Sequence, residues 1–105
     1  MPRPLCSLDE IPEDGARGLD LVDLAIVAVK SDGQLFLYRN NCPHLGLRLE
    51  YQENEFLDLD GAHILCSTHG ALFTLDQGEC VFGPCLGDHL EAIPFEVRGN
   101  TVWIE

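Results

Sequence analysis

Two short segments of this chain each place a cysteine and a histidine within a few residues of one another. The first reads Cys42-Pro43-His44 and the second reads Cys66-Ser67-Thr68-His69. Structural zinc sites usually group like ligands with like, whereas one thiol and one imidazole in each of two separate loops suit a mixed cluster. The four side chains therefore predict a metal centre, built from two loops that the fold must bring together.

The residues that flank these ligands extend the pattern. Each histidine is followed closely by a glycine, in Cys42-Pro43-His44-Leu45-Gly46 and in Cys66-Ser67-Thr68-His69-Gly70, and a Gly83-Pro84 pair follows downstream. In these segments the chain resembles the Rieske iron-sulfur family, and the likeness runs over nearly the whole chain. The resemblance implies a Rieske-type 2Fe-2S cluster, one per chain, with a proline-bearing loop over it. Its ligands would be Cys42 and Cys66 on the inner iron, and His44 and His69 on the outer iron.

Chain length limits what such a protein can contain. With 105 residues, 46% of them apolar, the sequence suits one compact domain with a modest core. We expect a single domain over residues 1–105, with a cluster-binding subdomain at approximately 40–85. Oxygenases with a Rieske centre need a separate catalytic domain, so we expect an electron-transfer component and not an enzyme.

Alternating and β-branched runs separated by turn residues predict an all-β fold of short antiparallel strands. The expected strands pair into hairpins: 24–30 with 34–38, 56–59 with 62–65, 73–75 with 79–81, and 89–97 with 101–104. Ser7-Leu8-Asp9-Glu10 has the form of a capping box, but Pro12 and Gly15 limit it to one short helical turn. The ligand loops would then lie in a subdomain inserted between strands of the base, as the resemblance also implies.

Net charge and hydropathy limit the kinds of partner that this chain can bind. Six basic against eighteen acidic residues give a formal charge of -12, which argues against nucleic acid. The charge suits partners with basic docking surfaces, although it also simply keeps a small protein soluble. The longest apolar run, Leu24 to Val29, is too short to cross a bilayer, and no secretory apolar region follows the start Met1-Pro2-Arg3-Pro4. We expect a soluble, cytoplasmic protein without a membrane partner.

Other cysteines and histidines are expected to be structural. Cys6, Cys80 and Cys85 are odd in number, which favours buried thiols in a reducing compartment over a disulfide scaffold. Cys80 and Cys85 flank a short loop, so an approach between them stays open. His63 and His89 have no cysteine at ligand spacing, and we expect them at the surface or in the core.

The residues near the ligands also predict the redox potential. Rieske centres span roughly -150 to +300 mV, and hydrogen bonds to the cluster set the position within that range. High-potential members of the family have a disulfide between the ligand loops, where this chain has Leu47 and Thr68, and hydroxyl donors where it has Ala71 and Phe73. None of these can form that disulfide or supply those donors, so we expect the low end of the range. Bound imidazoles titrate, so the potential should fall at alkaline pH.

These observations favour a Rieske ferredoxin that passes single electrons from a flavin-dependent ferredoxin reductase to a terminal oxygenase acting on aromatic rings. The small Rieske subunit of an NADH-dependent assimilatory nitrite reductase is a second interpretation, with the same size and fold. A third, of another class, is a zinc-stabilised interaction module without redox activity. Colour separates the last from the others, because iron-sulfur proteins are brown and zinc proteins are colourless.

Overall fold

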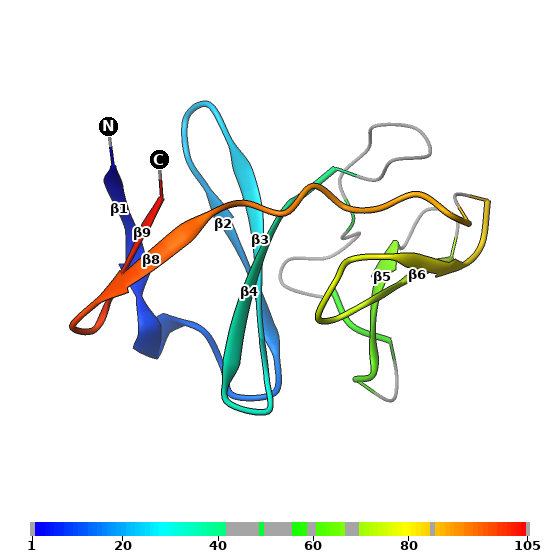
Figure 1. Cartoon of the computed structure of the whole chain (residues 1–105), viewed down its shortest axis with the longest axis horizontal. Coiled ribbons are helices and arrows are strands. Elements are labelled where there is room, and N and C mark those ends of the chain that lie inside the picture. Colours follow the sequence, from blue (N-terminus) through cyan, green and yellow to red (C-terminus); the bar gives the residue numbers. More distant parts are fainter. Residues whose placement is uncertain are drawn as a thin grey trace.

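The computed structural model describes residues 2–41, 49, 56–58, 61–66, 70–84 and 86–104. Within these residues, nine strands form three antiparallel sheets of three strands each, so the all-β prediction is confirmed. Figure 1 shows the sheets following one another along the long axis, with both termini at the same end of the molecule. In the described part of the chain, no helix is long and apolar enough to cross a membrane.

We name the sheets by their position along this axis. The terminal sheet, at the end where the termini lie, contains β1 (Arg3–Ser7), β9 (Thr101–Ile104) and β8 (Phe95–Arg98), in that order. The central sheet contains β2 (Ala16–Asp20), β3 (Ala25–Ser31) and β4 (Gln34–Arg39). The distal sheet contains β5 (His63–Cys66), β6 (Ala71–Thr74) and β7 (Cys80–Phe82). One 3-10 turn, η1 (Leu8–Glu10), follows β1.

Both faces of the central sheet are buried. The four consecutive residues Ile26 to Val29 of β3 have no exposed surface. Successive side chains of a strand point to opposite faces, so Val27 and Val29 pack with the distal sheet, while Ile26 and Ala28 pack with the terminal sheet. This double burial explains why β3 reads as an unbroken apolar run instead of an alternating one.

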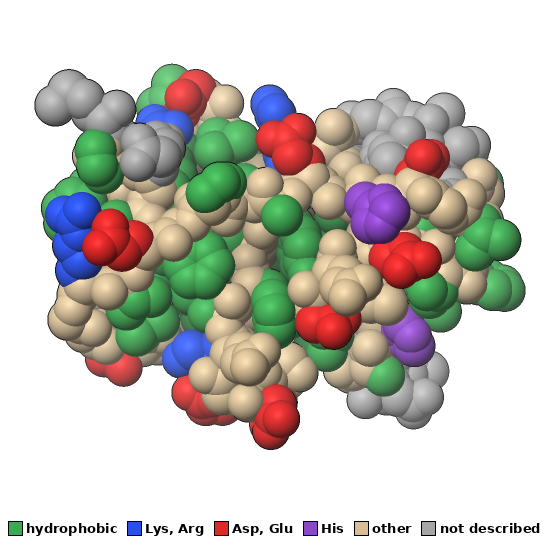
Figure 2. All heavy atoms as spheres, viewed as in Figure 1, with side chains coloured by type: hydrophobic (Ala, Val, Ile, Leu, Met, Phe, Trp, Pro, Cys, Tyr) green, Lys and Arg blue, Asp and Glu red, His purple; other side chains and the backbone are tan. Residues whose placement is uncertain are grey.

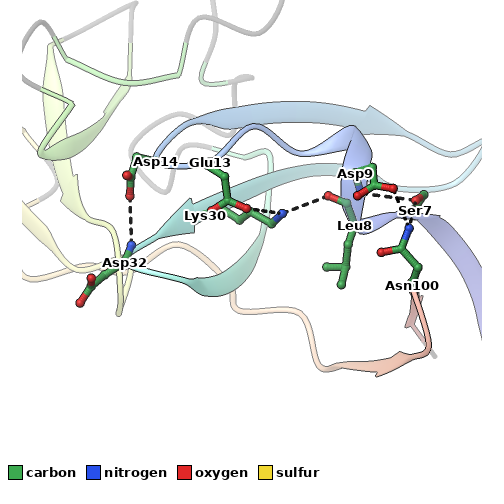
Figure 3. A network of polar contacts seen from close by, with 8 residues as sticks. All are labelled: Ser7, Leu8, Asp9, Glu13, Asp14, Lys30, Asp32 and Asn100. Atoms are coloured by element: carbon green, nitrogen blue, oxygen red, sulfur yellow. Dashed lines mark hydrogen bonds and ion pairs between the residues drawn. The ribbon is translucent and has the colours of Figure 1, made fainter.

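A polar network fixes η1 to the last hairpin (Figure 3). The capping box expected at Ser7 is present: the Ser7 N–H donates to the Glu10 carboxylate at 2.7 Å, and the Ser7 hydroxyl accepts from the Asp9 N–H at 3.3 Å. The Asn100 amide donates to the Ser7 hydroxyl at 2.8 Å and to the Asp9 carboxylate at 2.9 Å. The turn between β8 and β9 is therefore held to the start of the chain.

Two strands were not predicted from the sequence. β1 contains a proline and pairs with β9, the last strand of the chain, across a bulge between Pro4 and Cys6. β2 has no alternating pattern and contains Gly18 in its middle, yet all five of its residues pair with β3. In both cases the partner strand, and not the local sequence, determines the extended conformation.

The predicted hairpins are confirmed in part. The pairs β3–β4, β6–β7 and β8–β9 form as expected, with ends shifted by one or more residues. The strand expected at 89–97 is shorter, because His89 and Ala92 make only isolated bridges and Pro94, which has no N–H to donate, precedes β8. The expected pairing of 56–59 with 62–65 reduces, in the described residues, to one bridge between Leu57 and Ile64.

Candidate metal centre

The structure describes one of the four predicted ligands. Cys66 is the last residue of β5, lies opposite Ala71 of β6 and has no exposed surface. Cys42, His44 and His69 lie outside the described residues. Within the residues that are described, no three His, Cys, Asp or Glu side chains come together in a way that could hold a metal ion. The four-residue ligand set therefore remains a prediction, which the surroundings of Cys66 and of the two loops can support.

The second ligand loop closes the end of the β5–β6 hairpin. The Gly70 N–H donates to the Cys66 carbonyl at 2.8 Å, which returns the chain to β6. Gly70 has a φ of +71°, a conformation that residues with a side chain rarely adopt, and a Cβ at this position would meet no atom within 4 Å. The glycine is thus required by the backbone turn and not by a close neighbour.

The first ligand loop has both ends fixed. Asn40 follows β4, is buried, and donates its N–H to the Ala25 carbonyl at 2.9 Å. Its side-chain oxygen accepts the N–H of Leu49 at 2.7 Å, which joins the two ends of the segment 41–48. Leu49 is fully buried in the same core cluster as Cys66. The two predicted ligand loops therefore start from one shared piece of core.

The Gly83-Pro84 loop lies against the end of the same hairpin. A Cβ on Gly83 would be 2.8 Å from the Cα of Ala71, the residue paired with Cys66, and Gly83 has a φ of +105°. The Gly87 N–H donates to the Cys80 carbonyl at 3.4 Å, so the loop folds back onto β7. The loop therefore lies against Ala71, the residue paired with Cys66, while its expected place over a cluster stays a prediction.

The donor set and its surroundings fit an iron-sulfur cluster. A buried thiol at a chain reversal, within an apolar cluster, suits a soft metal ligand shielded from water. Ala71 and Phe73 are fully buried beside it and have no side-chain donor. Cys42, His44, Cys66 and His69 would hold the cluster.

His63 is held by an acidic neighbour. Its ring nitrogen Nδ1 lies 3.4 Å from Asp58 Oδ2, while Asp58 Oδ1 accepts the N–H groups of Ala62 at 2.9 Å and His63 at 3.3 Å. Desolvation acts to raise the pKa of Asp58, but these hydrogen bonds and the His63 ring outweigh it and hold the pKa below its usual value. His63 is thus held at the start of β5, beside the turn that precedes this strand.

The other cysteines that the structure describes are buried. Cys6 packs in the core cluster between the terminal and central sheets, where burial raises the pKa of its thiol. Cys80 is buried in β7 and directs its thiol to the Phe82 carbonyl at 3.3 Å. Cys85 lies outside the described residues, so its expected state and any approach to Cys80 stay predictions.

Sequence reasoning missed Asn40 and Leu49, whose hydrogen bond joins residues nine positions apart in the chain. The Asn40 amide gave no signal, since many asparagines occur near strand ends. Gly83 was singled out with Pro84 because a Gly-Pro pair marks a turn, but its contact with Ala71 was not predicted.

The fold and the described part of the site define the class of this protein: a small all-β domain in which a buried cysteine ends one strand of the distal sheet, with a glycine-proline turn against the residue paired with it. The model of the Rieske 2Fe-2S domain matches residues 1–94. The chain belongs to this family, which confirms the resemblance seen in the sequence.

The chain is also similar to individual ferredoxins of dioxygenase systems. The chain is 27% identical, over 100 residues, to the biphenyl dioxygenase ferredoxin subunit of Pseudomonas sp. (strain KKS102), with 95% of this chain and 87% of the relative covered. The ferredoxin of carbazole 1,9a-dioxygenase from Nocardioides aromaticivorans IC177 superposes with a TM-score of 0.77 at 18% identity, over 99% of this chain and 96% of that one.

A longer chain in the reduced complex between oxygenase and ferredoxin of carbazole 1,9a-dioxygenase contains a similar unit. It superposes with a TM-score of 0.81 at 20% identity, over 98% of this chain. This chain spans 27% of the length of that one. At these identities the structural matches show the shared fold.

Proposed function

We propose that this protein is a Rieske-type ferredoxin that moves one electron at a time between a flavin-dependent reductase and a terminal oxygenase of a ring-hydroxylating system. The observation that supports this most directly is the similarity to a dioxygenase ferredoxin subunit over 95% of this chain and 87% of the relative. The site adds a buried thiol, Cys66, at the closed end of a hairpin.

The proposed centre is one 2Fe-2S cluster per chain, held by Cys42, His44, Cys66 and His69. Bound there, the cluster would supply a one-electron couple. The chain's own residues keep water from the thiol of Cys66, join Asn40 to Leu49 and place Gly83 against the hairpin end. Residues 40–85, approximately, would form the cluster-binding subdomain of a single domain.

A low potential is part of this proposal. Ala71 and Phe73 are buried next to Cys66, and their side chains contain no hydrogen-bond donor. Fewer hydrogen bonds to the cluster stabilise its reduced state less, so its potential is lower. A low potential suits a carrier that feeds an oxygenase.

An exposed apolar patch marks where a partner would bind. Val81, Phe82 and Leu86 flank the Gly83-Pro84 loop and are 42%, 63% and 69% exposed. The surrounding segment, residues 49–94, contains nine acidic and no basic side chains. In Figure 2 the basic side chains in view lie over the left and centre of the molecule, and the right end shows acidic, histidine and apolar ones. A partner with an apolar contact area inside a basic rim would fit this end.

The experiment is anaerobic purification, followed by iron and sulfide analysis, absorption spectroscopy and electron paramagnetic resonance of the reduced protein. We expect two irons and two labile sulfides per chain, with the signature of mixed thiolate and imidazole ligation. Cys66→Ser should abolish this signature. Cys80→Ser, which replaces another buried thiol of the same sheet, should retain it. A colourless protein containing zinc would exclude the proposal.

Electron transfer needs its own measurement. The purified ferredoxin should accept electrons from NADH through the flavin reductase of a biphenyl dioxygenase system and return them to that system's oxygenase. A cluster-loaded protein that is reduced by a nitrite reductase and by no such flavin reductase would favour the nitrite reductase subunit instead.

A further inference from the structure

We propose that the outer edge of β8 binds a second copy of this chain, so that two terminal sheets join into one continuous antiparallel sheet. This inference concerns the end of the molecule opposite the candidate metal centre and goes beyond the proposed electron transfer. Figure 1 shows β8 at the end where the termini lie, away from β5 and β6.

β8 is an edge strand with both faces accessible. It pairs with β9 on one side, and no described strand pairs with its other side. All four of its residues are exposed, with Phe95 at 38% and Val97 at 41%. An edge of this kind is a template for a further strand.

The backbone of β8 has its hydrogen-bonding groups in a suitable place. The turn Gly99-Asn100 has two residues, and such a hairpin closes on a hydrogen-bonded pair, here Arg98 with Thr101. Alternate residues point their N–H and C=O groups to opposite sides, so those of Val97 and Phe95 point to the open edge. Val97 can therefore exchange two hydrogen bonds with Val97 of a second copy.

The side chains then become self-complementary. With Val97 on the two-fold axis, Glu96 lies opposite Arg98 of the second copy, and the reverse pair forms at the other end. Within one chain these two side chains already form an ion pair of 3.0 Å on the same side of the strand. A register shifted by one residue in each copy would place Glu96 opposite Glu96, which like-charge repulsion disfavours.

The other face of β8 favours the same contact. Phe95 and Val97 pair with Ile104 and Val102, which are buried, so they extend the core face of the sheet beyond its covered part. Pairing two copies places Val97 against Val97 and removes apolar surface from water.

The charge distribution permits association at this end. Residues 49–94 contain nine acidic and no basic side chains, whereas the remainder contains nine acidic and six basic ones. Copies joined through β8 keep their strongly acidic ends apart, which limits the repulsion expected from a net charge of -12.

Sedimentation equilibrium of the full-length, cluster-loaded protein tests the proposal. A contact of one short strand is small, so we expect a dissociation constant on the order of 10⁻⁴ M. The weight-average mass should rise from monomer towards dimer between about 10 µM and about 1 mM protein. A monomer throughout this range would overturn the proposal.

Charge reversal tests the register. Glu96→Arg and Arg98→Glu should each weaken the dimer at least tenfold, because each places like charges opposite one another. The double variant E96R/R98E should restore it, and an equimolar mixture of the two single variants should form a heterodimer. Asp88→Arg, with the same charge change as Glu96→Arg on the exposed opposite end, should behave as the unmodified protein. If the single variants have the same dimer dissociation constant as the unmodified protein, the interface lies elsewhere and the assignment to β8 is refuted. The same conclusion follows if the double variant dimerises as weakly as the single variants.

Discussion

Gly83 is fixed by two separate constraints. Its φ of +105° disfavours any side chain, and a Cβ would press on the backbone of Ala71 at 2.8 Å. We predict that Gly83→Ala lowers the free energy of unfolding by about 2–4 kcal/mol, since backbone strain and a steric clash add. It should also move the loop away from the hairpin end that contains Cys66. Urea unfolding and the rate of cluster loss measure the two effects.

Gly87→Ala is the matched control for this change. Gly87 has a similar φ of +94°, but a Cβ there would meet no atom within 4 Å. We expect about 1 kcal/mol of destabilisation from backbone strain alone. Equal effects of the two substitutions would show that the contact between Gly83 and Ala71 is unimportant.

Tyr38 connects two sheets through one hydroxyl. It lies in β4, is 2% exposed, and donates to the Leu75 carbonyl at 2.8 Å, next to the β6–β7 turn. Desolvation, with a smaller contribution from the negative charge of Asp76, raises its pKa to about 12. The unfolded chain ionises this group near pH 10, so its contribution to stability is complete below about pH 10 and is lost as the pH rises towards about 12.

We predict that Tyr38→Phe lowers the free energy of unfolding at pH 7 by about 1 kcal/mol, because the hydrogen bond is lost. Phenylalanine does not ionise, so the difference between the two proteins should shrink above pH 10, at no more than about 1.4 kcal/mol per pH unit, and reverse in sign before pH 12. Urea unfolding across this pH range checks both statements. A constant difference would show that Tyr38 does not titrate differently in the folded state.

Among elements, the residue that follows β4 is joined to Leu49, beyond the first predicted ligand segment, by a side-chain hydrogen bond. Asn40 accepts the buried N–H of Leu49 at 2.7 Å and so joins the ends of the first ligand loop. We predict that Asn40→Ala destabilises the fold by about 1–3 kcal/mol, because the Leu49 N–H is left without this acceptor. The loop should open more often, and the protein should lose iron faster to a chelator.

The neighbouring Asn41→Ala provides the control, because Asn41 is exposed. It should leave stability within about 0.5 kcal/mol and iron release unchanged. If both variants release iron at the original rate, the Asn40 amide does not hold the loop.

Strands that have a turn or an alternating pattern in the local sequence could be predicted, and strands without such a pattern could not. Gln34–Arg39 and Thr101–Ile104 both follow two-residue turns, and Thr101–Ile104 also alternates in burial, so their hairpins could be predicted from the sequence. β1 contains Pro4 and pairs with a strand at the other end of the chain, which no local window detects. The four ligands stay a prediction from chemistry, made because two cysteine-histidine pairs with flanking glycines are rare by chance.

At the scale of the whole molecule, charge is distributed unevenly along the long axis. The basic residues that the structure describes lie in the terminal and central sheets, and most are paired with carboxylates, as Arg3 is with Asp23 at 3.0 Å. The distal end has acidic groups and the exposed patch of Val81, Phe82 and Leu86. This polarity would orient the molecule as it approaches a basic partner.

We predict that reduction by a flavin reductase slows as salt rises. Between about 10 mM and about 500 mM ionic strength, the second-order rate constant should fall by about tenfold or more, because screening removes long-range attraction. Stopped-flow absorbance of the cluster measures the rate. Phe82→Ala should slow it at every salt concentration without changing this slope, since it removes contact area and no charge. A rate that rises with salt would indicate an acidic docking surface on the reductase.

The sequence by itself determined the family and the class of fold, and it predicts the metal chemistry. Ligand types and spacing depend on a few neighbouring residues, and hairpins depend on turns and alternation, so both are local properties. Tertiary structure alone decided how β1 closes on β9, how Asn40 holds Leu49 and how Gly83 meets Ala71. These contacts join residues that are separated in the chain or in neighbouring strands, and they form only once the central sheet is buried on both faces.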